Sequence, residues 1–146
     1  MNDLKNLYQE VILDHSKHPR HFHALDPCDH SATGYNPLCG DNLKIFVRMD
    51  GDTIAEVSFV GDGCAISKAS ASLMTDLARG KTLAEFAHLY HDFHHIATTQ
   101  DPIPDSVGKL KVLAGVREYP SRVKCATLAW HTLDAALHGK KEAKTE

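Results

Sequence analysis

The stretch LKIFVRMDGDTIAEVSFVGDGC, residues 43–64, carries the clearest fold signal in the chain. Apolar and polar side chains alternate over residues 43–49, which is the pattern of a half-buried β-strand. The sequence Asp-Gly-Asp at 50–52 is a turn signal, and residues 53–60 return as a second strand. The stretch therefore predicts a β-hairpin that ends at GDGC, residues 61–64.

Helical periodicity precedes the hairpin. Apolar residues at i, i+3, i+4, i+7 and i+8 predict an amphipathic helix that ends between His15 and His18, before Pro19. These apolar residues are Leu4, Leu7, Tyr8, Val11 and Ile12. Residues 16–38 are mostly polar, and we expect an ordered loop there with a short edge strand near 32–35.

Four helical segments are predicted after the hairpin. They cover residues 65–79, a stretch that starts at Thr82, residues 107–114, and a last segment from Ser121 to Gly139. The second of them opens with the capping-box pattern Thr-x-x-Glu. Its inward face is expected to comprise Leu83, Phe86, Tyr90 and Phe93.

This order of helix, strands and helices favours an α+β fold, with a small antiparallel β-sheet and helices packed on one face. The chain has 146 residues, of which 42% are hydrophobic, and this is enough for one core. Neither an internal repeat nor a break in composition divides the sequence. We therefore expect one domain over residues 1–146, with about 140–146 as a flexible, solvated tail.

Charge and hydropathy exclude two classes of partner. Lysine and arginine total 16 against 19 acidic residues, a formal net charge of −3, so no basic face for nucleic acid is expected. No apolar run approaches the ~20 residues of a membrane span, and the N-terminus lacks the pattern of a secretory signal. The expected location is the cytoplasm, with no membrane partner.

Four cysteines, Cys28, Cys39, Cys64 and Cys125, are the candidates for chemistry. In a reducing compartment, cysteines more often bind metal or react as thiols than form disulfides. No pair has C-x-x-C spacing, which disfavours a zinc ribbon and a thioredoxin-type redox motif.

Three of these cysteines lie at predicted element boundaries. Cys39 precedes Asp41 by two positions in NPLCGD, residues 36–41, while Cys64 and Cys125 lie at or near helix starts. The positive end of a helix dipole favours thiolate, so we expect a lowered pKa at both helix positions. Three thiolates and one carboxylate form a tetrahedral donor set suited to Zn²⁺, in which the carboxylate is the more replaceable ligand.

A simpler interpretation competes with metal binding at each position. A single free cysteine is more often a small buried hydrophobe, and this interpretation is kept for Cys28, with an exposed bystander as the variant. His88, His91 and His95 share one helix face, which suits either a second metal or plain solvation. The histidines between residues 15 and 23 are expected to face solvent.

Three motifs resemble those of a known family. NPLCGD (36–41), GDGCAISKASASLM (61–74) and RVKCATLAW (122–130) resemble the cysteine motifs of iron–sulfur assembly proteins of the IscU/NifU family, most closely its SufU branch. The resemblance covers nearly the whole chain and implies a small antiparallel sheet with helices over one face. It also implies that one metal ion is bound by Cys39, Asp41, Cys64 and Cys125.

Three departures separate the SufU branch from the cluster scaffold. In the IscU-type scaffold a histidine directly precedes the third cysteine, whereas this chain has Lys124 there. The scaffold's chaperone motif Leu-Pro-Pro-Val-Lys is replaced by residues 119–124, Tyr-Pro-Ser-Arg-Val-Lys. The stretch between Cys64 and Cys125 is also longer than in the scaffold. All three favour the SufU branch.

The SufU resemblance implies a zinc-dependent sulfurtransferase. Its partner would be a PLP-dependent cysteine desulfurase of the SufS type, which would deliver persulfide sulfur to Cys39 for downstream Suf cluster-assembly proteins. A partner side chain that replaced Cys39 on the zinc would release a nucleophilic thiolate. Two candidate partner contacts, Arg122 and Lys124, lie just before Cys125 in the sequence.

Two other functions remain open from the sequence. The same donors could hold iron, as a scaffold on which an iron–sulfur cluster is built transiently, although Lys124 disfavours this. A purely structural zinc domain is the third interpretation, and Asp41 disfavours it, because closed zinc sites favour cysteine and histidine.

Overall fold

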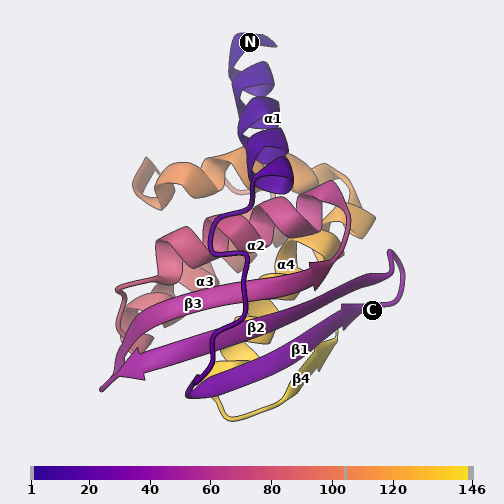
Figure 1. Cartoon of the computed structure of the whole chain (residues 1–146). Helices are drawn as coiled ribbons and strands as arrows, with labels where there is room; N and C mark the ends of the chain where they lie inside the picture. The colour runs from indigo at the N-terminus through magenta and orange to yellow at the C-terminus, as the bar shows by residue number, and fades with distance from the viewer. Residues whose placement is uncertain (1, 104, 145–146) are drawn as a thin grey trace.

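The structure is a computed structural model that describes residues 2–103 and 105–144 (Figure 1). Its elements, in chain order, are α1 (Asn2–Lys17), β1 (His30–Asn36), β2 (Asp41–Asp50), β3 (Thr53–Asp62), α2 (Ala65–Ala78), α3 (Leu83–Thr98), the 3₁₀ segment η1 (Asp105–Glu118), α4 (Pro120–Leu137) and β4 (Glu142–Lys144). No helix in the described part of the chain is long and apolar enough to span a membrane.

Four strands form one mixed sheet in the order β3-β2-β1-β4. The predicted hairpin is confirmed as β2 and β3, joined by a turn with Gly51 at φ 62°. β1 pairs antiparallel with β2, whereas β4 pairs parallel with β1. The expected antiparallel sheet is therefore corrected to a mixed one, and β1 is a seven-residue inner strand rather than a short edge strand.

The chain end was predicted to be a flexible tail from about residue 140, and the structure has the short strand β4 within this segment. The backbone N–H of Thr33 donates to the carbonyl of Lys141 at 2.9 Å, which starts the pairing with β1. Side chains of this three-residue strand stay mostly exposed. Backbone pairing therefore holds a segment whose side chains give no strand signal. Residues 145–146 lie outside the described part.

The helices pack on one face of the sheet, as predicted; in Figure 1 α3 and α4 lie behind the sheet, α2 lies above β3, and α1 stands above α2. α4 packs against β1 and β2, and α2 packs against β3. α1 contacts α2 and η1, and its predicted helix is confirmed, although the side chains of Leu4 and Leu7 lie outside the described part. The connection from α1 to β1 runs across β3 and β2 (Figure 1).

Side-chain chemistry explains the helix boundaries. Thr82 Oγ1 accepts the N–H of Glu85 at 3.1 Å, and the Glu85 carboxylate accepts the N–H of Thr82 at 2.9 Å, so the predicted capping box is confirmed. Leu83, predicted to face inward, is 40% exposed at the first residue of α3. The expected short helix at 107–114 is a longer 3₁₀ segment, kinked at Gly108.

The core lies between the sheet and the helices. Trp130 of α4 is fully buried and stacks with Phe93 and Phe86 of α3, at ring-centroid distances of 4.4 and 6.1 Å. Its indole N–H donates to Ser70 Oγ of α2 at 3.0 Å, so a buried polar atom is satisfied. These contacts fix α4, which carries Cys125, against both neighbouring helices.

Candidate metal centre

The β1–β2 turn and the β3–α2 junction lie at the same end of the sheet (Figure 1). Asn36 pairs with Asp41 across the turn, so residues 37–40 form a tight connection that carries Cys39. Gly40 lies inside this turn at φ 72°, a conformation that glycine adopts without strain. Cys64 follows β3 as the N-cap of α2, which confirms its predicted place at a helix start.

Three of the four predicted site residues converge on one point. The potential ligand atoms of Cys39, Asp41 and Cys125 all lie within 4.8 Å of one another. The two sulfur atoms are 3.1 Å apart, with the Cys125 thiol as donor. All four cysteines are free thiols. Among the described residues, this is the only group of three potential metal ligands gathered in this way.

Asp41 is fully buried, and both of its carboxylate oxygens are hydrogen-bonded. Oδ1 accepts the backbone N–H of Cys64 at 2.8 Å, and Oδ2 accepts an amide N–H of Asn36 at 3.3 Å. A Cβ placed on Gly63 would lie only 3.0 Å from Asp41 Oδ1. The GDGC motif therefore leaves room for the carboxylate because residue 63 has no side chain.

Cys64 lies at the margin of the group. Its sulfur accepts the backbone N–H of Ser67 at 3.4 Å, in the first turn of α2. Cys64 lies outside the group of three potential ligands. Its thiol nevertheless interacts with the Cys125 thiol and raises the pKa of Cys125. The structure thus brings all four predicted residues to one region and gathers three of them around one point.

Cys125 differs from the expectation of a lowered pKa. Burial raises the pKa of its thiol, and hydrogen bonds with Cys39 and Cys64 raise it further. Cys125 is only 3% exposed and lies more than one turn beyond Pro120, where the helix-dipole effect has faded. Desolvation therefore outweighs the dipole at this position.

The donor set fits a tetrahedral metal ion of the zinc or iron class. Cys39 and Cys125 offer sulfur and Asp41 offers oxygen as potential ligand atoms, and the Cys64 sulfur is a further thiol at the margin of this group. A buried carboxylate beside thiols is costly unless a cation or hydrogen bonds compensate it. Chemistry alone suggested that the carboxylate would be the replaceable ligand. Asp41 is fully buried, whereas Cys39 is exposed.

Asn36 belongs to the site and was not found from the sequence. Its side chain is fully buried, and its amide donates to Asp41 Oδ2 and to the Cys125 sulfur, the latter at 3.6 Å. The available signal was an asparagine at a strand end directly before proline, five residues ahead of a predicted ligand. That pattern is also ordinary turn chemistry, so it did not indicate a role.

The other predicted contact residues, Arg122 and Lys124, have contacts outside the group of three. The Arg122 guanidinium lies over the ring of Tyr119, 4.4 Å from the ring centre, and both side chains are exposed. Lys124 lines an open hollow between α3 and α4 together with His94 and His131. Cys28 is half-buried and lies apart from the three converging ligands.

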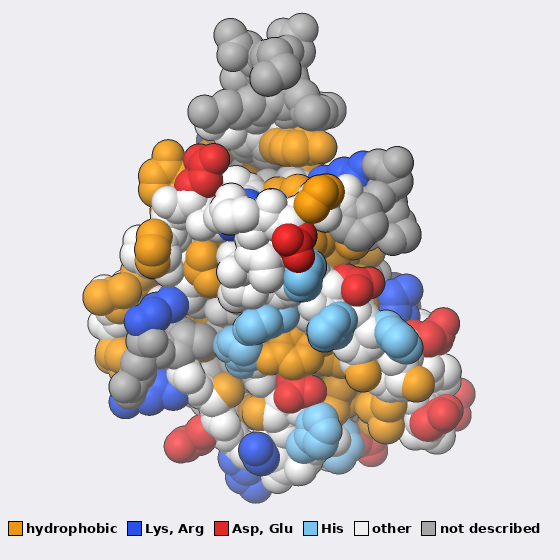
Figure 2. All heavy atoms as spheres, turned by 180° about the vertical axis from the view of Figure 1, so that it is seen from behind, with side chains coloured by type: hydrophobic (Ala, Val, Ile, Leu, Met, Phe, Trp, Pro, Cys, Tyr) orange, Lys and Arg blue, Asp and Glu red, His pale blue; other side chains and the backbone are white. Residues whose placement is uncertain are grey.

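Histidines gather on the helical face seen from behind (Figure 2). His88, His91 and His95 are exposed on α3, and within the described residues they belong to no group of three potential ligands. On the neighbouring face, the Tyr90 hydroxyl bonds His131 Nδ1, and burial raises the pKa of Tyr90 to about 12. Burial also lowers the pKa of His131.

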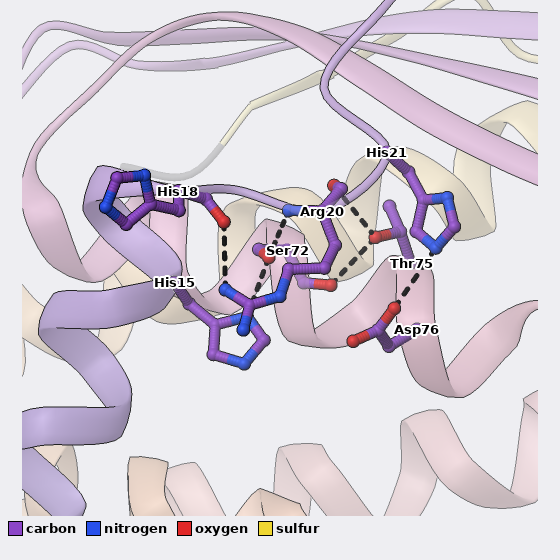
Figure 3. Close-up of polar contacts among 7 residues, drawn as sticks. All are labelled: His15, His18, Arg20, His21, Ser72, Thr75 and Asp76. Atoms are coloured by element: carbon purple, nitrogen blue, oxygen red, sulfur yellow. Dashed lines mark hydrogen bonds and ion pairs between the residues drawn. The ribbon is translucent and has the colours of Figure 1, made fainter.

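The histidines between residues 15 and 23 were expected to face solvent, and this is wrong for His15. His15 is 4% exposed, and its Nδ1 lies 2.7 Å from Ser72 Oγ of α2 (Figure 3). His21 forms a second contact with α2, because its Nε2 lies 3.1 Å from Asp76 Oδ1. This segment thus anchors α1 to α2.

Comparisons with known proteins agree over almost the full length. Residues 7–145 match the family described as NifU-like N terminal domain. The chain is 39% identical over 145 residues to the iron-sulfur cluster assembly scaffold protein IscU of Streptococcus pyogenes serotype M1, covering 99% of this chain and 91% of that protein. It is 38% identical over 139 residues to the zinc-dependent sulfurtransferase SufU of Bacillus subtilis strain 168, covering 92% of each chain.

A solved structure agrees as well. It comes from Fervidobacterium islandicum AW-1 and is described as a candidate iron-sulfur cluster assembly scaffold protein for the SUF system (FiSufU), with a TM-score of 0.83 and 34% identity. The match covers 88% of this chain and 94% of that one. With the family match and the two relatives, this shows that the chain belongs to the NifU-like N-terminal domain family, the IscU/NifU family, with SufU among its close relatives.

Proposed function

We propose that this chain is a zinc-dependent sulfurtransferase of iron–sulfur cluster biogenesis. It accepts persulfide sulfur on Cys39 from a PLP-dependent cysteine desulfurase of the SufS type. The observation that carries this proposal is the exposed Cys39 thiol next to a buried carboxylate and a buried thiol. The relative named zinc-dependent sulfurtransferase SufU supports it.

The residues that would hold Zn²⁺ are Cys39, Asp41, Cys64 and Cys125. A bound Zn²⁺ supplies positive charge that keeps these thiols deprotonated. This matters most at Cys125, where burial raises the pKa of the thiol in the metal-free protein. The buried Asp41 and Cys125 then form the inner side of the site, and Cys39 forms its outer side.

The reaction is a thiolate attack on a persulfide. The Cys39 thiolate attacks the terminal sulfur of the partner's cysteine persulfide. A new sulfur–sulfur bond forms on Cys39, the partner's sulfur–sulfur bond breaks, and the partner's cysteine leaves as a thiolate. Atoms and electrons balance without an external oxidant. Cys39 suits this role because it is exposed, whereas Cys125 is buried.

Surrounding residues support partner contact. We place Arg122 and Lys124 at the desulfurase interface, since the exposed Arg122–Tyr119 pair begins α4 and Lys124 precedes Cys125. Lys124 at the position where the scaffold has histidine also favours sulfur transfer. We place the reaction in the cytoplasm, with downstream Suf cluster-assembly proteins as the recipients of the sulfur.

The alternative function is a scaffold for an iron–sulfur cluster. The specific observation in its favour is that the relative from Streptococcus pyogenes is named as an IscU scaffold at comparable identity. Three sulfur donors and one oxygen donor can hold iron as well as zinc. Metal content alone therefore does not separate the two functions.

Cysteine turnover by the desulfurase tests the proposal. The zinc-loaded chain is added in substoichiometric amount with a reductant and without iron. We expect many-fold stimulation for the wild-type chain, and we expect Cys39→Ser to leave the rate at that of the desulfurase alone, because a hydroxyl cannot accept the sulfur. Cys28→Ser is the matched control and should stimulate like the wild-type chain.

Two outcomes would overturn the assignment. Normal stimulation by Cys39→Ser would show that another group accepts the sulfur. Absence of stimulation, together with a stable cluster on the chain when iron is supplied, would establish the scaffold function instead.

A further inference from the structure

We propose that Asn36 is a positioning residue of the metal centre, which orients Asp41 and Cys125 as ligands. This inference rests on the proposed metal binding. It adds a fifth residue to the site, one that contacts two ligands without being a ligand itself.

The orientation of the Asn36 amide follows from its contacts. Its Oδ1 accepts the backbone N–H of Leu38 at 3.2 Å, and an amide nitrogen could not accept this bond. The Nδ2 group therefore faces the ligands. It has two hydrogens and two partners, Asp41 Oδ2 at 3.3 Å and Cys125 Sγ at 3.6 Å.

Burial makes these bonds hard to replace. The Asn36 side chain is fully buried, so water has no access to take over its bonds to Asp41 and Cys125. Asn36 is also the last residue of β1 and pairs with Asp41, the first residue of β2. The amide is therefore held at a strand end and connects β1, β2 and α4.

The contacts make the ligands unequal. Asp41 is held at both oxygens, by the Cys64 N–H and by Asn36, and Cys125 receives the second amide hydrogen. In the described part of the chain, the Cys39 thiol has only the Cys125 sulfur as a hydrogen-bond partner, and Cys39 is exposed. Hydrogen bonds to ligand atoms orient them and stabilise their charged forms. Asn36 thus stabilises the inner pair and not Cys39.

Substitution of Asn36 tests this role. Asn36→Asp keeps the shape, removes both donors and places a second carboxylate beside Asp41. Asn36→Leu removes the donors without adding charge, and it serves if the aspartate variant fails to fold. Asn42→Asp is the matched control, because Asn42 is exposed on β2, next to Asp41. Circular dichroism of the metal-free proteins checks that each variant is folded.

Two measurements on the purified full chain show whether a variant binds metal differently from the wild-type chain. Competition with a chromophoric chelator gives the zinc dissociation constant, and the absorption spectrum of the Co²⁺-loaded protein reports thiolate ligands and their geometry. We expect a loss of zinc affinity of about 10- to 100-fold in the Asn36 variants, which is typical when a residue that orients metal ligands is replaced. We also expect a changed Co²⁺ spectrum, and a control equal to the wild-type chain.

The outcomes separate the two proposals. Wild-type affinity and an unchanged Co²⁺ spectrum in a folded Asn36 variant would overturn the role of Asn36 and leave the metal site intact. A wild-type chain without thiolate-to-cobalt absorption would overturn metal binding itself, and the role of Asn36 with it. Reduced affinity in the Asn36 variants alone supports the inference.

Discussion

At the scale of single residues, Gly63 is a close constraint on the Asp41 carboxylate. An added Cβ would lie 3.0 Å from Asp41 Oδ1 and 3.1 Å from the Cβ and Oγ of Ser67. Ser67 Oγ is buried and has no hydrogen-bond partner among the described residues. The pocket around the Asp41 carboxylate is therefore closely filled, and a methyl group there has to displace one of these neighbours.

Gly63→Ala is predicted to lower zinc affinity by about 10-fold, because the methyl group pushes Asp41 out of its bond with the Cys64 N–H. Competition with a chelator measures this. Gly115→Ala is the control, since a Cβ at Gly115 meets nothing within 4 Å. Equal zinc affinity in both variants would mean that Asp41 tolerates the shift or does not bind the metal.

The sequence predicted the four candidate ligands because sulfur and carboxylate have few other reasons to lie at glycine-rich boundaries. It could not predict Asn36, whose role depends on its proximity to Cys125, a residue 89 positions away in the chain. It also gave the wrong direction for the pKa of Cys125. The dipole of a helix is visible in sequence, whereas the depth of burial that outweighs it is not.

At the scale of elements, the attachment of α1 to α2 depends on a polar network (Figure 3). Ser72 Oγ of α2 contacts His15 Nδ1 at 2.7 Å and accepts the backbone N–H of Arg20 at 2.8 Å. Thr75 Oγ1 donates to the carbonyl of Arg20 at 3.4 Å. Sequence periodicity predicted both helices, but the partner that buries His15 is 57 residues away, so its burial was missed.

This network predicts loss of stability in acid. Burial lowers the pKa of His15 below its ordinary value of 6.5, with charged groups around it as smaller influences. Those groups are Arg20, Asp76, Asp14 and Lys109. As the pH falls, the unfolded chain therefore binds a proton at His15 at a higher pH than the folded chain does. The contribution of the buried His15 to stability is therefore complete above about pH 6.5, and it is lost as the pH drops below this value.

Thermal unfolding at about pH 8 and about pH 5 measures the effect. His15→Gln should show a smaller fall in Tm on acidification than the wild-type chain, because glutamine does not gain a proton. Part of the fall should remain, since burial also lowers the pKa of His131. His18→Gln is the control, because His18 is exposed. An identical fall in the wild-type and His15→Gln chains would contradict the prediction.

The elements that the sequence predicted correctly are those with a regular spacing of apolar side chains. The hairpin strands and the helices α2, α3 and α4 each have a repeating apolar face, and all were found. The strand β4 was missed because backbone bonds to β1 hold it. The 3₁₀ segment η1 was found only in part: the predicted residues 107–114 lie within its longer span, which is kinked at Gly108.

At the scale of the whole molecule, the candidate metal centre lies where the two layers of the fold meet. Cys39 and Asp41 belong to the sheet side, Cys64 begins α2, and Cys125 lies in α4. The layers already approach closely, because a Cβ at Gly34 of β1 would clash with Thr132 Oγ1 of α4. A bound ion would therefore link the sheet to both helices that pack on it.

Zinc is thus predicted to stabilise the whole fold. A ligand that binds only the folded state adds about 2.7 kcal/mol when its free concentration is a hundred times its dissociation constant. For a chain of this size, each kcal/mol raises Tm by roughly 2–4 °C. Trp130, the only tryptophan, is fully buried beside the helices that the ion would link, so its fluorescence reports the transition.

The control variants identify which site produces the stabilisation. Asp41→Ala should lose most of the zinc-dependent rise in Tm, because it removes the buried oxygen ligand, whereas Cys28→Ser should keep it. A rise that persists in Asp41→Ala would place the stabilising zinc elsewhere, with the exposed histidines of α3 as the first place to look. A wild-type Tm that zinc leaves unchanged would mean that the ion does not join the two layers, because binding to the folded state alone must raise Tm.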